Sequence, residues 1–269
     1  MRVNRWHFVL APMALIFALP LLWLAVSSFM TNAQINTFPP KIIPDGLHLD
    51  GYRYVFRTGD FGHWFLNSTI VAVVTVASNL VFCSFAGYAF ARMRFRGSRV
   101  LLALMLATLV IPFQLTMIPT FLLMKHLGLI DSLGALILPS LVTPFGVFLL
   151  RQFFVSLPRE IEEAAWIDGC SRMAILMKVV LPLARPALAT VAVLTLLVVW
   201  NDLTWPLIAI NSDTNYTVQL GLATYQGAHR TEWSAVMAGN VLVTLPIVLA
   251  FLLAQRTFIR SLTSTAVKG

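Results

Sequence analysis

Long apolar stretches separated by short polar segments dominate the sequence. Six stretches are long enough to cross about 30 Å of hydrocarbon as single helices. They cover approximately residues 8–29, 65–91, 100–124, 133–154, 187–210 and 237–259. This pattern predicts an all-α polytopic membrane protein with six transmembrane helices, whose two ends lie on the same side of the membrane.

The polar segment 30–64 separates the first span from the other five. It carries several prolines and acidic residues, and we expect a loop with a short amphipathic helix around Tyr52–Phe56. The chain therefore divides into 1–64, with the N-terminus, first span and loop, a five-helix transmembrane domain over 65–260, and a short tail over 261–269.

Among the predicted spans that contain proline, the third and the fourth each carry two near the middle of the chain. Pro112 and Pro119 should kink the third span, because each lacks a backbone N–H and clashes with the preceding turn. Pro139 and Pro144 lie in the fourth span. A kink is therefore expected in the third span.

Composition and charge support a membrane protein. The chain is 58% hydrophobic and 11% charged, with a mean hydropathy of +0.82, which is outside the soluble globular range. On one side of the predicted membrane lie 14 Lys and Arg with four acidic residues, and on the other five with six. By the positive-inside rule, both termini and the segment between spans four and five are cytoplasmic. The net charge of +8 is thus a topology signal and not a nucleic-acid surface.

The sequence carries no motif of a catalytic or metal-binding protein. GxxxxGK[ST], GxSxG and HExxH are absent. The two cysteines, Cys83 and Cys170, are far apart and form no CxxC pair. We therefore predict no catalytic residue, no metal site and no cofactor bound by this chain.

The predicted cytoplasmic segment 156–182 has the pattern of two helices joined at a glycine. Ser156 is expected to cap the first helix and Pro158 to open its first turn. Gly169 should end this helix in a left-handed conformation, and Ser171 should cap the second. We call 156–182 the elbow.

The first arm of the elbow has the residues of a docking surface. Two small alanines, Ala164 and Ala165, would let the helix sit close in a groove, and an acidic side chain such as Glu163 or Asp168 offers a partner's Arg or Lys a charge-assisted bond. Arg159 lies one turn from Glu163, at the spacing of an ion pair.

The elbow closely resembles the "EAA" loop of ABC-importer permeases, and the chain as a whole resembles the MalG-like permeases of carbohydrate-type importers over approximately residues 67–269. Cys170 is one departure, since that family usually has alanine after the glycine. The resemblance rests on Glu163-Ala164-Ala165, Asp168-Gly169, Leu181-Pro182, Pro186, the span-two exit Ala86–Arg92 and the C-terminal stretches Leu253–Arg256 and Leu262–Gly269.

This resemblance implies a type I importer permease fold in a bacterial or archaeal plasma membrane. It implies a MalF-like sister permease, an ABC ATPase dimer that binds ATP and Mg²⁺, and an extracytoplasmic solute-binding protein. In that family the elbow is the coupling helix, and the tail, here Thr263–Gly269, reaches into the ATPase dimer. The coupling residues would be Glu163, Ala164, Ala165, Asp168 and Gly169.

Four polar residues inside the predicted spans are candidates for the substrate path. Asn201 and Asp202 lie in Trp200–Pro206, which either lines the path or forms an aromatic belt at the outer interface. This segment resembles the WN-x-x-x-WP run of many sugar permeases. Asn240 and Gln114 either line the path or hydrogen-bond within the helix bundle.

Three functions compete at this point. A carbohydrate importer permease is favoured, and the same architecture could serve a glycerol-3-phosphate or glycerophosphodiester importer. A stand-alone secondary carrier usually needs several intramembrane carboxylates or unwound helices. Asp202 is the single acid well inside a predicted span, so the sequence favours a pathway whose energy comes from another subunit.

Overall fold

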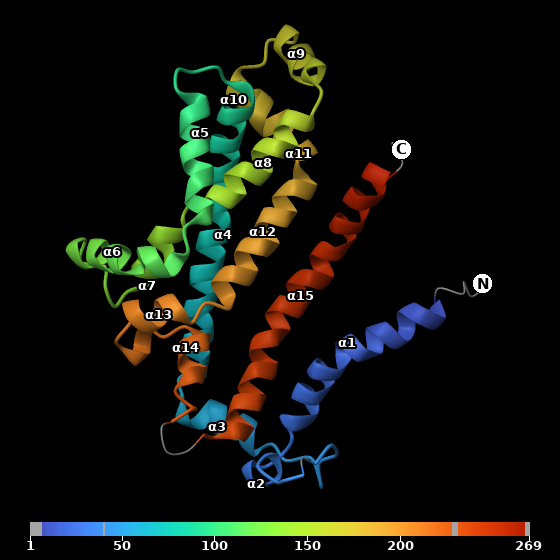
Figure 1. The fold of residues 1–269 in the computed structure, drawn as a ribbon, viewed down its shortest axis with the longest axis vertical. Helices are drawn as coiled ribbons and strands as arrows, with labels where there is room; N and C mark the ends of the chain where they lie inside the picture. The colour runs from blue at the N-terminus through green and yellow to red at the C-terminus, as the bar shows by residue number, and fades with distance from the viewer. Residues whose placement is uncertain (1–6, 40, 228–230, 267–269) are drawn as a thin grey trace. The chain divides into compact units, whose positions relative to one another are not determined.

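The computed structural model describes residues 7–39, 41–227 and 231–266, and its regular secondary structure is helical apart from one isolated bridge between Gln226 and Thr231 (Figure 1). In chain order its α-helices are α1 (His7–Ser27), α2 (Asn32–Ile35), α3 (Asp50–Thr58), α4 (Phe61–Arg92), α5 (Ser98–Ala107), α6 (Phe113–His126), α7 (Leu133–Ile137), α8 (Pro144–Ser156), α9 (Arg159–Ile167), α10 (Arg172–Ile175), α11 (Leu181–Leu183), α12 (Arg185–Trp200), α13 (Thr204–Ala209), α14 (Val218–Ala223) and α15 (Trp233–Ala266). Short 3₁₀ segments are η1 (Thr108–Val110), η2 (Leu138–Ser140) and η4 (Asp213–Asn215), and η3 (Leu176–Val180) is a π-helix.

The chain forms two compact units. Unit 1 comprises residues 1–65 and 218–246, and unit 2 comprises 66–217 and 247–269. The boundary therefore cuts α4 and α15, and the predicted division at residues 64 and 260 stays a prediction.

The all-α membrane prediction is confirmed, but only part of it as continuous spans. Within the described residues, four segments are long and apolar enough to cross a bilayer: Leu10–Ser27, Phe61–Arg92, Leu133–Ser156 and Trp233–Leu253. Two further spans appear only as bent helix pairs, with angles of 106° for Ser98–Val110 with Phe113–His126, and 78° for Arg172–Leu183 with Arg185–Trp200. The kink predicted for span three is therefore confirmed as a sharp bend, and the chain has up to six spans if each bent pair counts as one.

The third predicted span breaks at Pro112. The chain becomes extended at Ile111, with φ −80° and ψ 115°, and Pro112 then caps α6. A proline disfavours helical backbone in the residue before it, so the ring ends one helix and starts the next. Pro119, in contrast, lies within α6 without ending it.

The fifth predicted span ends early, at Trp200. Asn201 forms the C-cap of α12, and the Asp202 carboxylate accepts a hydrogen bond of 3.3 Å from the backbone N–H of Trp205. A short side chain that binds backbone N–H groups favours a new helix start over helix continuation. Residues 204–209 therefore form the separate helix α13.

The predicted polar loop 211–236 is more ordered than expected. It contains η4 and α14, with Val218, Leu220 and Leu222 buried. Asp131 anchors its start, because the carboxylate accepts from the backbone N–H groups of Asn211 and Ser212 at 2.9 and 2.8 Å and from the Ser212 hydroxyl. These bonds lower the pKa of Asp131 to about 2, so the carboxylate that holds this loop stays charged until the pH falls to about that value.

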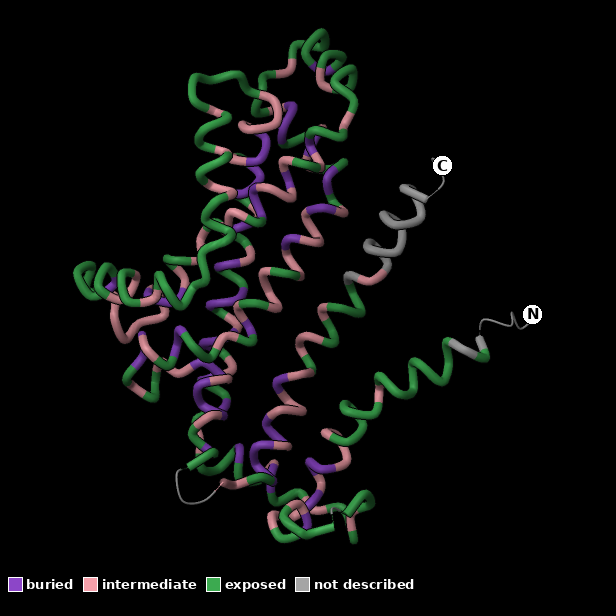
Figure 2. The backbone as a smooth tube through the Cα atoms, viewed as in Figure 1, coloured by how far each residue is buried: buried purple, intermediate pink, exposed green. Residues whose placement is uncertain are grey.

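A buried core connects five helical segments of unit 2 (Figure 2). At its centre lie Leu150 and Phe154 of α8, which are fully buried. Its members come from α4, α8, α9, the α10–η3 run and α12: Cys83, Tyr88, Val147, Leu150, Phe154, Ala165, Ile175, Leu176, Val180, Ala184, Ala187 and Val191. One residue of the elbow helix α9 thus belongs to the same core as the membrane-spanning helices.

A buried amide joins α4 to the interrupted fourth span. Asn79 is fully buried, and its Nδ2 donates to the backbone oxygens of Thr75 at 3.0 Å and Ser140 at 2.7 Å. Its Oδ1 accepts from the Thr143 hydroxyl at 2.8 Å. These bonds satisfy polar groups at the point where η2 leaves the helical hydrogen-bond ladder, which is necessary inside an apolar environment.

The candidate coupling elbow

The first arm of the elbow starts two residues later than predicted. α8 ends at Ser156, whose hydroxyl donates to the Phe153 oxygen at 2.7 Å and therefore does not cap α9. Leu157 and Pro158 are extended, with ψ of 137° and 135°, and Pro158 occupies the N-cap position. The prediction that Ser156 caps the helix was wrong, because its hydroxyl is committed to the helix before it.

Gly169 turns the chain between the two arms, as predicted. Its φ is +81°, in the left-handed region that favours glycine. The N–H of Gly169 donates to Trp166 O and that of Cys170 to Ala165 O, both at 3.0 Å, which closes the C-terminus of α9. Ser171 then caps α10 by accepting from Ala174 N at 3.3 Å.

The second arm is helical to Leu183 but is not a uniform α-helix. The π-helix η3 lies between α10 and α11 and precedes Pro182. Proline has no N–H to donate to the carbonyl four residues back and clashes with it in a regular helix. A π-type widening is one way to accommodate such a residue.

The elbow helix α9 has one inward face and one outward face. Ala165 is buried in the unit 2 core, whereas Trp166 and Ile167 are 56% and 88% exposed. Glu163 and Ala164 are exposed as well. The expectation that both alanines face outward was therefore wrong: Ala165 packs inward, and its small side chain lets α9 approach its own core closely.

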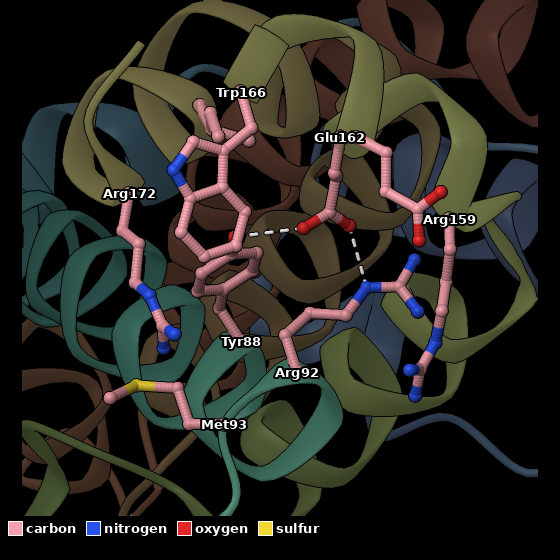
Figure 3. A pocket seen from close by; sticks show the side chains of 9 residues that line it. Tyr88, Arg92, Met93, Arg159, Glu162, Trp166 and Arg172 are labelled. Carbon is pink, nitrogen blue, oxygen red and sulfur yellow. Dashed lines mark hydrogen bonds and ion pairs between the residues drawn. The ribbon is translucent and has the colours of Figure 1, made fainter. Parts of the chain in front are cut away.

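An ion pair ties α9 to the end of α4 (Figure 3). Glu162 Oε1 accepts from Arg92 Nε at 2.6 Å, and its Oε2 accepts from the Tyr88 hydroxyl at 2.9 Å. The Arg92 guanidinium also donates to Leu157 O at 2.8 Å. The side chains of Arg92 and Glu162 are only 9% and 15% exposed. We call Tyr88, Arg92 and Glu162 the latch.

The latch replaces the ion pair predicted from helical spacing. Arg159 and Glu163 form no salt bridge within the described residues, and both are exposed. Beside the latch, the Arg172 guanidinium lies over the Trp166 ring at 5.3 Å from its centre, a distance at which a cation is attracted to the ring face. These side chains border a pocket of about 130 Å³.

Sequence reasoning missed Glu162, although a signal was present. Tyr88 and Arg92 are four residues apart at the end of a predicted helix and so share one face. A tyrosine and an arginine on one face can both donate to one carboxylate. The sequence could not show which of the neighbouring glutamates turns toward them.

The four path candidates differ in the contacts that the structure gives them. Gln114 is exposed on α6, and the Asn201 amide donates to Leu197 O of its own helix at 2.8 Å. Asp202 caps α13. Asn240 belongs to unit 1 and donates to Val236 O at 2.8 Å. Their contacts in this structure are local helix contacts, so their role in a path stays a prediction.

Residues 80–264 match the family of inner-membrane components of binding-protein-dependent transport systems. The chain belongs to this family. The matched range contains the C-terminal part of α4 with Tyr88 and Arg92, the whole elbow and α12, so the family assignment covers the site described above.

Two similar relatives and one solved structure agree with this assignment. The permease is 39% identical over 259 residues to the arabinooligosaccharides transport system permease protein AraQ of Halalkalibacterium halodurans, covering 95% of this chain and 93% of the relative. It is 32% identical over 260 residues to AraQ of Bacillus subtilis, covering 96% and 92%. The fold matches a crystal structure of a bacterial ABC transporter involved in the import of the acidic polysaccharide alginate, with a TM-score of 0.79, 26% identity and coverage of 96% and 98%.

These matches establish the type I importer permease fold expected from the sequence. The permease is a membrane-spanning transport component and not a catalytic subunit. Within this fold, the elbow helix α9 has one face anchored in the core of unit 2 and one exposed face.

Proposed function

We propose that this chain is the permease subunit of an ATP-driven oligosaccharide importer. It forms the translocation path with a sister permease and receives its cargo from an extracytoplasmic binding protein. An ATPase dimer, which holds the ATP and Mg²⁺, docks on the elbow. The observation that carries this proposal is the exposed outer face of α9 in a chain of the binding-protein-dependent transport family.

The outer face of α9 has the chemistry of a protein-docking surface. Trp166 and Ile167 are large, apolar and exposed, although they lie on a short helix outside the predicted spans. Glu163 and Asp168 flank them with negative charge. An apolar centre with charged edges suits a groove on a partner, where the apolar side chains supply affinity and the carboxylates meet Lys or Arg. Gly169 and Ala164 add little bulk, so a groove can approach closely.

The relatives support a carbohydrate cargo. AraQ is named for arabinooligosaccharides, and the matched crystal structure is of a transporter for alginate. Both are chains of sugar units, and we infer the same class for this permease.

The proposed orientation places the elbow and both termini in the cytoplasm of a bacterial or archaeal cell. The excess of Lys and Arg on that side supports it. The predicted insertion of the tail into the ATPase dimer concerns Thr263–Gly269, of which 267–269 lie outside the described residues.

The mechanism we propose is alternating access. Closure of the ATPase dimer on ATP moves the groove that holds α9. The elbow passes this movement to the spans, which open the path toward the binding protein, and hydrolysis resets them. Because α9 shares a core with α4, α8 and α12, the movement reaches these helices through direct packing.

Charge and polarity changes on the outer face should weaken ATPase binding. We expect Ile167→Asp and Glu163→Lys each to reduce the amount of ATPase copurified from native membranes at least about tenfold, which corresponds to about 1.4 kcal/mol of binding free energy. The first buries a charge in the groove, and the second repels a basic rim. Quantitative immunoblotting of the purified complex measures this ratio.

The matched control is Leu127→Asp. Leu127 is also a large exposed apolar residue, at 51%, but lies in the turn after α6, on the predicted opposite side of the membrane. Its ATPase yield should equal that of the wild type. Equal ATPase recovery with Ile167→Asp and with the wild type would exclude the outer face of α9 as the docking site.

A further inference from the structure

The latch connects two segments that the chain itself leaves 70 residues apart. We propose that Tyr88, Arg92 and Glu162 fix the elbow helix α9 to the end of α4, so that α9 and this end of α4 move as one body during the transport cycle. Arg92 and Glu162 are then positioning residues for coupling. This inference rests on the proposed function, since it assumes that an ATPase moves α9.

Both oxygens of the Glu162 carboxylate are engaged by α4. Arg92 takes Oε1 and Tyr88 takes Oε2, from donors one helical turn apart. Two directional bonds to one carboxylate resist rotation of α9 about its axis as well as separation from α4. Charge-assisted bonds of this kind are shorter and stronger than neutral ones, and low exposure protects the pair from water and salt.

Arg92 also holds the start of α9. Its guanidinium donates to Leu157 O, in the two-residue extended link between α8 and α9. The Arg92 side chain therefore binds both α9, at Glu162, and the segment before α9, at Leu157. The extended link would otherwise let α9 change its orientation. Arg92 restrains α9 at Glu162 and restrains the link at Leu157.

Apolar packing alone does not supply this restraint. Ala165 gives α9 one buried contact residue, with a side chain of a single methyl group. Tyr88, in addition to its bond to Glu162, packs edge-on against Phe154 of α8, with ring centres 6.0 Å apart. The latch thus connects α9 to α4 by hydrogen bonds, and through Tyr88 to α8 by ring packing.

Under this proposal the adjacent residues Glu162 and Glu163 have different roles. Glu162 points into the protein and holds α9 in place, whereas Glu163 is exposed and available to the ATPase. A substitution at position 163 should weaken docking. A substitution at position 162 should leave docking intact and let the docked helix move without α4.

Distances between two spin labels test the proposal. One label replaces Arg94, just beyond α4, and the other replaces Glu160 on α9. Both positions are exposed. Cys170 is changed to alanine, while the fully buried Cys83 is kept. The complex is purified from native membranes with its ATPase, and electron paramagnetic resonance is recorded without nucleotide and after trapping with ATP and vanadate.

With an intact latch, the distance distribution should be narrow and the same in both states. In Glu162→Gln it should broaden or shift on trapping, and Tyr88→Phe, which removes one bond and keeps the ring, should give a smaller change in the same direction. Arg159→Gln removes a charge from an exposed side chain of α9 that forms no salt bridge in the described part of the chain, and its distribution should not change.

Two results would overturn the inference while leaving the proposed function standing. They are a distance that changes on trapping with the latch intact, and a Glu162→Gln distribution identical to that of the intact protein in both states, each with ATPase present in the purified complex. If the wild-type protein copurifies with no ATPase, the proposed function itself fails, and the inference fails with it.

Discussion

Gly169→Val should abolish most transport while leaving the permease in the membrane. Gly169 has φ +81°, where an L-residue costs about 1–2 kcal/mol and a β-branched residue is least tolerated. A Cβ at this position would meet nothing within 4 Å, so the penalty is one of backbone conformation and not of collision. Relief of this strain reorients α9 relative to α10, which misaligns the docking face. We expect uptake of the sugar that wild-type cells import to fall at least about tenfold at equal membrane abundance.

The chain offers two matched comparisons for this variant. Gly128 also has a positive φ, +69°, and open space around it, but lies between α6 and α7, away from the elbow. Gly128→Val should therefore reduce uptake far less. Asparagine tolerates the left-handed conformation better than valine, so the Gly169→Asn variant should retain much of the uptake activity. Wild-type uptake by Gly169→Val, or an equal loss in Gly128→Val, would show that the turn is not specific to coupling.

Asn79→Leu should strongly destabilise unit 2. The amide is fully buried, and its loss leaves Ser140 O and the Thr143 hydroxyl without the partner that each has in α4. A buried polar group without a partner costs about 1–3 kcal/mol. We expect the apparent melting temperature of the purified permease to fall by at least about 5 °C, since each kcal/mol corresponds to roughly 2–4 °C for a domain of this size.

Asn201→Leu is the control for this prediction. It makes the same substitution in the same unit, but Asn201 is exposed, and the hydrogen bond of its side chain within the described residues goes to Leu197 O of its own helix. Its melting temperature should stay within about 1–2 °C of the wild type. Equal shifts for the two variants would mean that the Asn79 bonds contribute no more than an exposed local contact.

The sequence alone was sufficient to predict the structural elements that depend on local residue patterns. Apolar length indicates the helices, and glycine followed by a capping serine indicates the turn at Gly169 and the start of α10. Residues at several fixed spacings indicated the family, which the match over residues 80–264 confirms. Each of these signals can be read from residues that are close together in the sequence or that stand at fixed spacings.

What the sequence did not reveal depends on contacts between distant segments. A proline predicts a bend but not its size, and Pro112 turns the chain by 106° whereas Pro119 remains within a helix. Among neighbouring glutamates, only the packing of Ala165 against the core determines that Glu162 faces α4. Three of the four polar residues singled out for a path, Asn201, Asp202 and Asn240, bond to backbone groups of their own helix or the next, because local backbone groups are the nearest partners.

Site-specific photo-crosslinking from position 167 is the most direct test of the central claim, that the outer face of α9 is where a separate ATPase acts on this permease. A benzophenone amino acid replaces Ile167, which is 88% exposed, and in a parallel strain replaces Leu127. After irradiation of native membranes, crosslinked partners are identified by mass spectrometry. We predict an ABC ATPase subunit crosslinked from position 167 and not from position 127. The absence of that ATPase from the crosslinks at position 167, in membranes that contain it, would contradict the account.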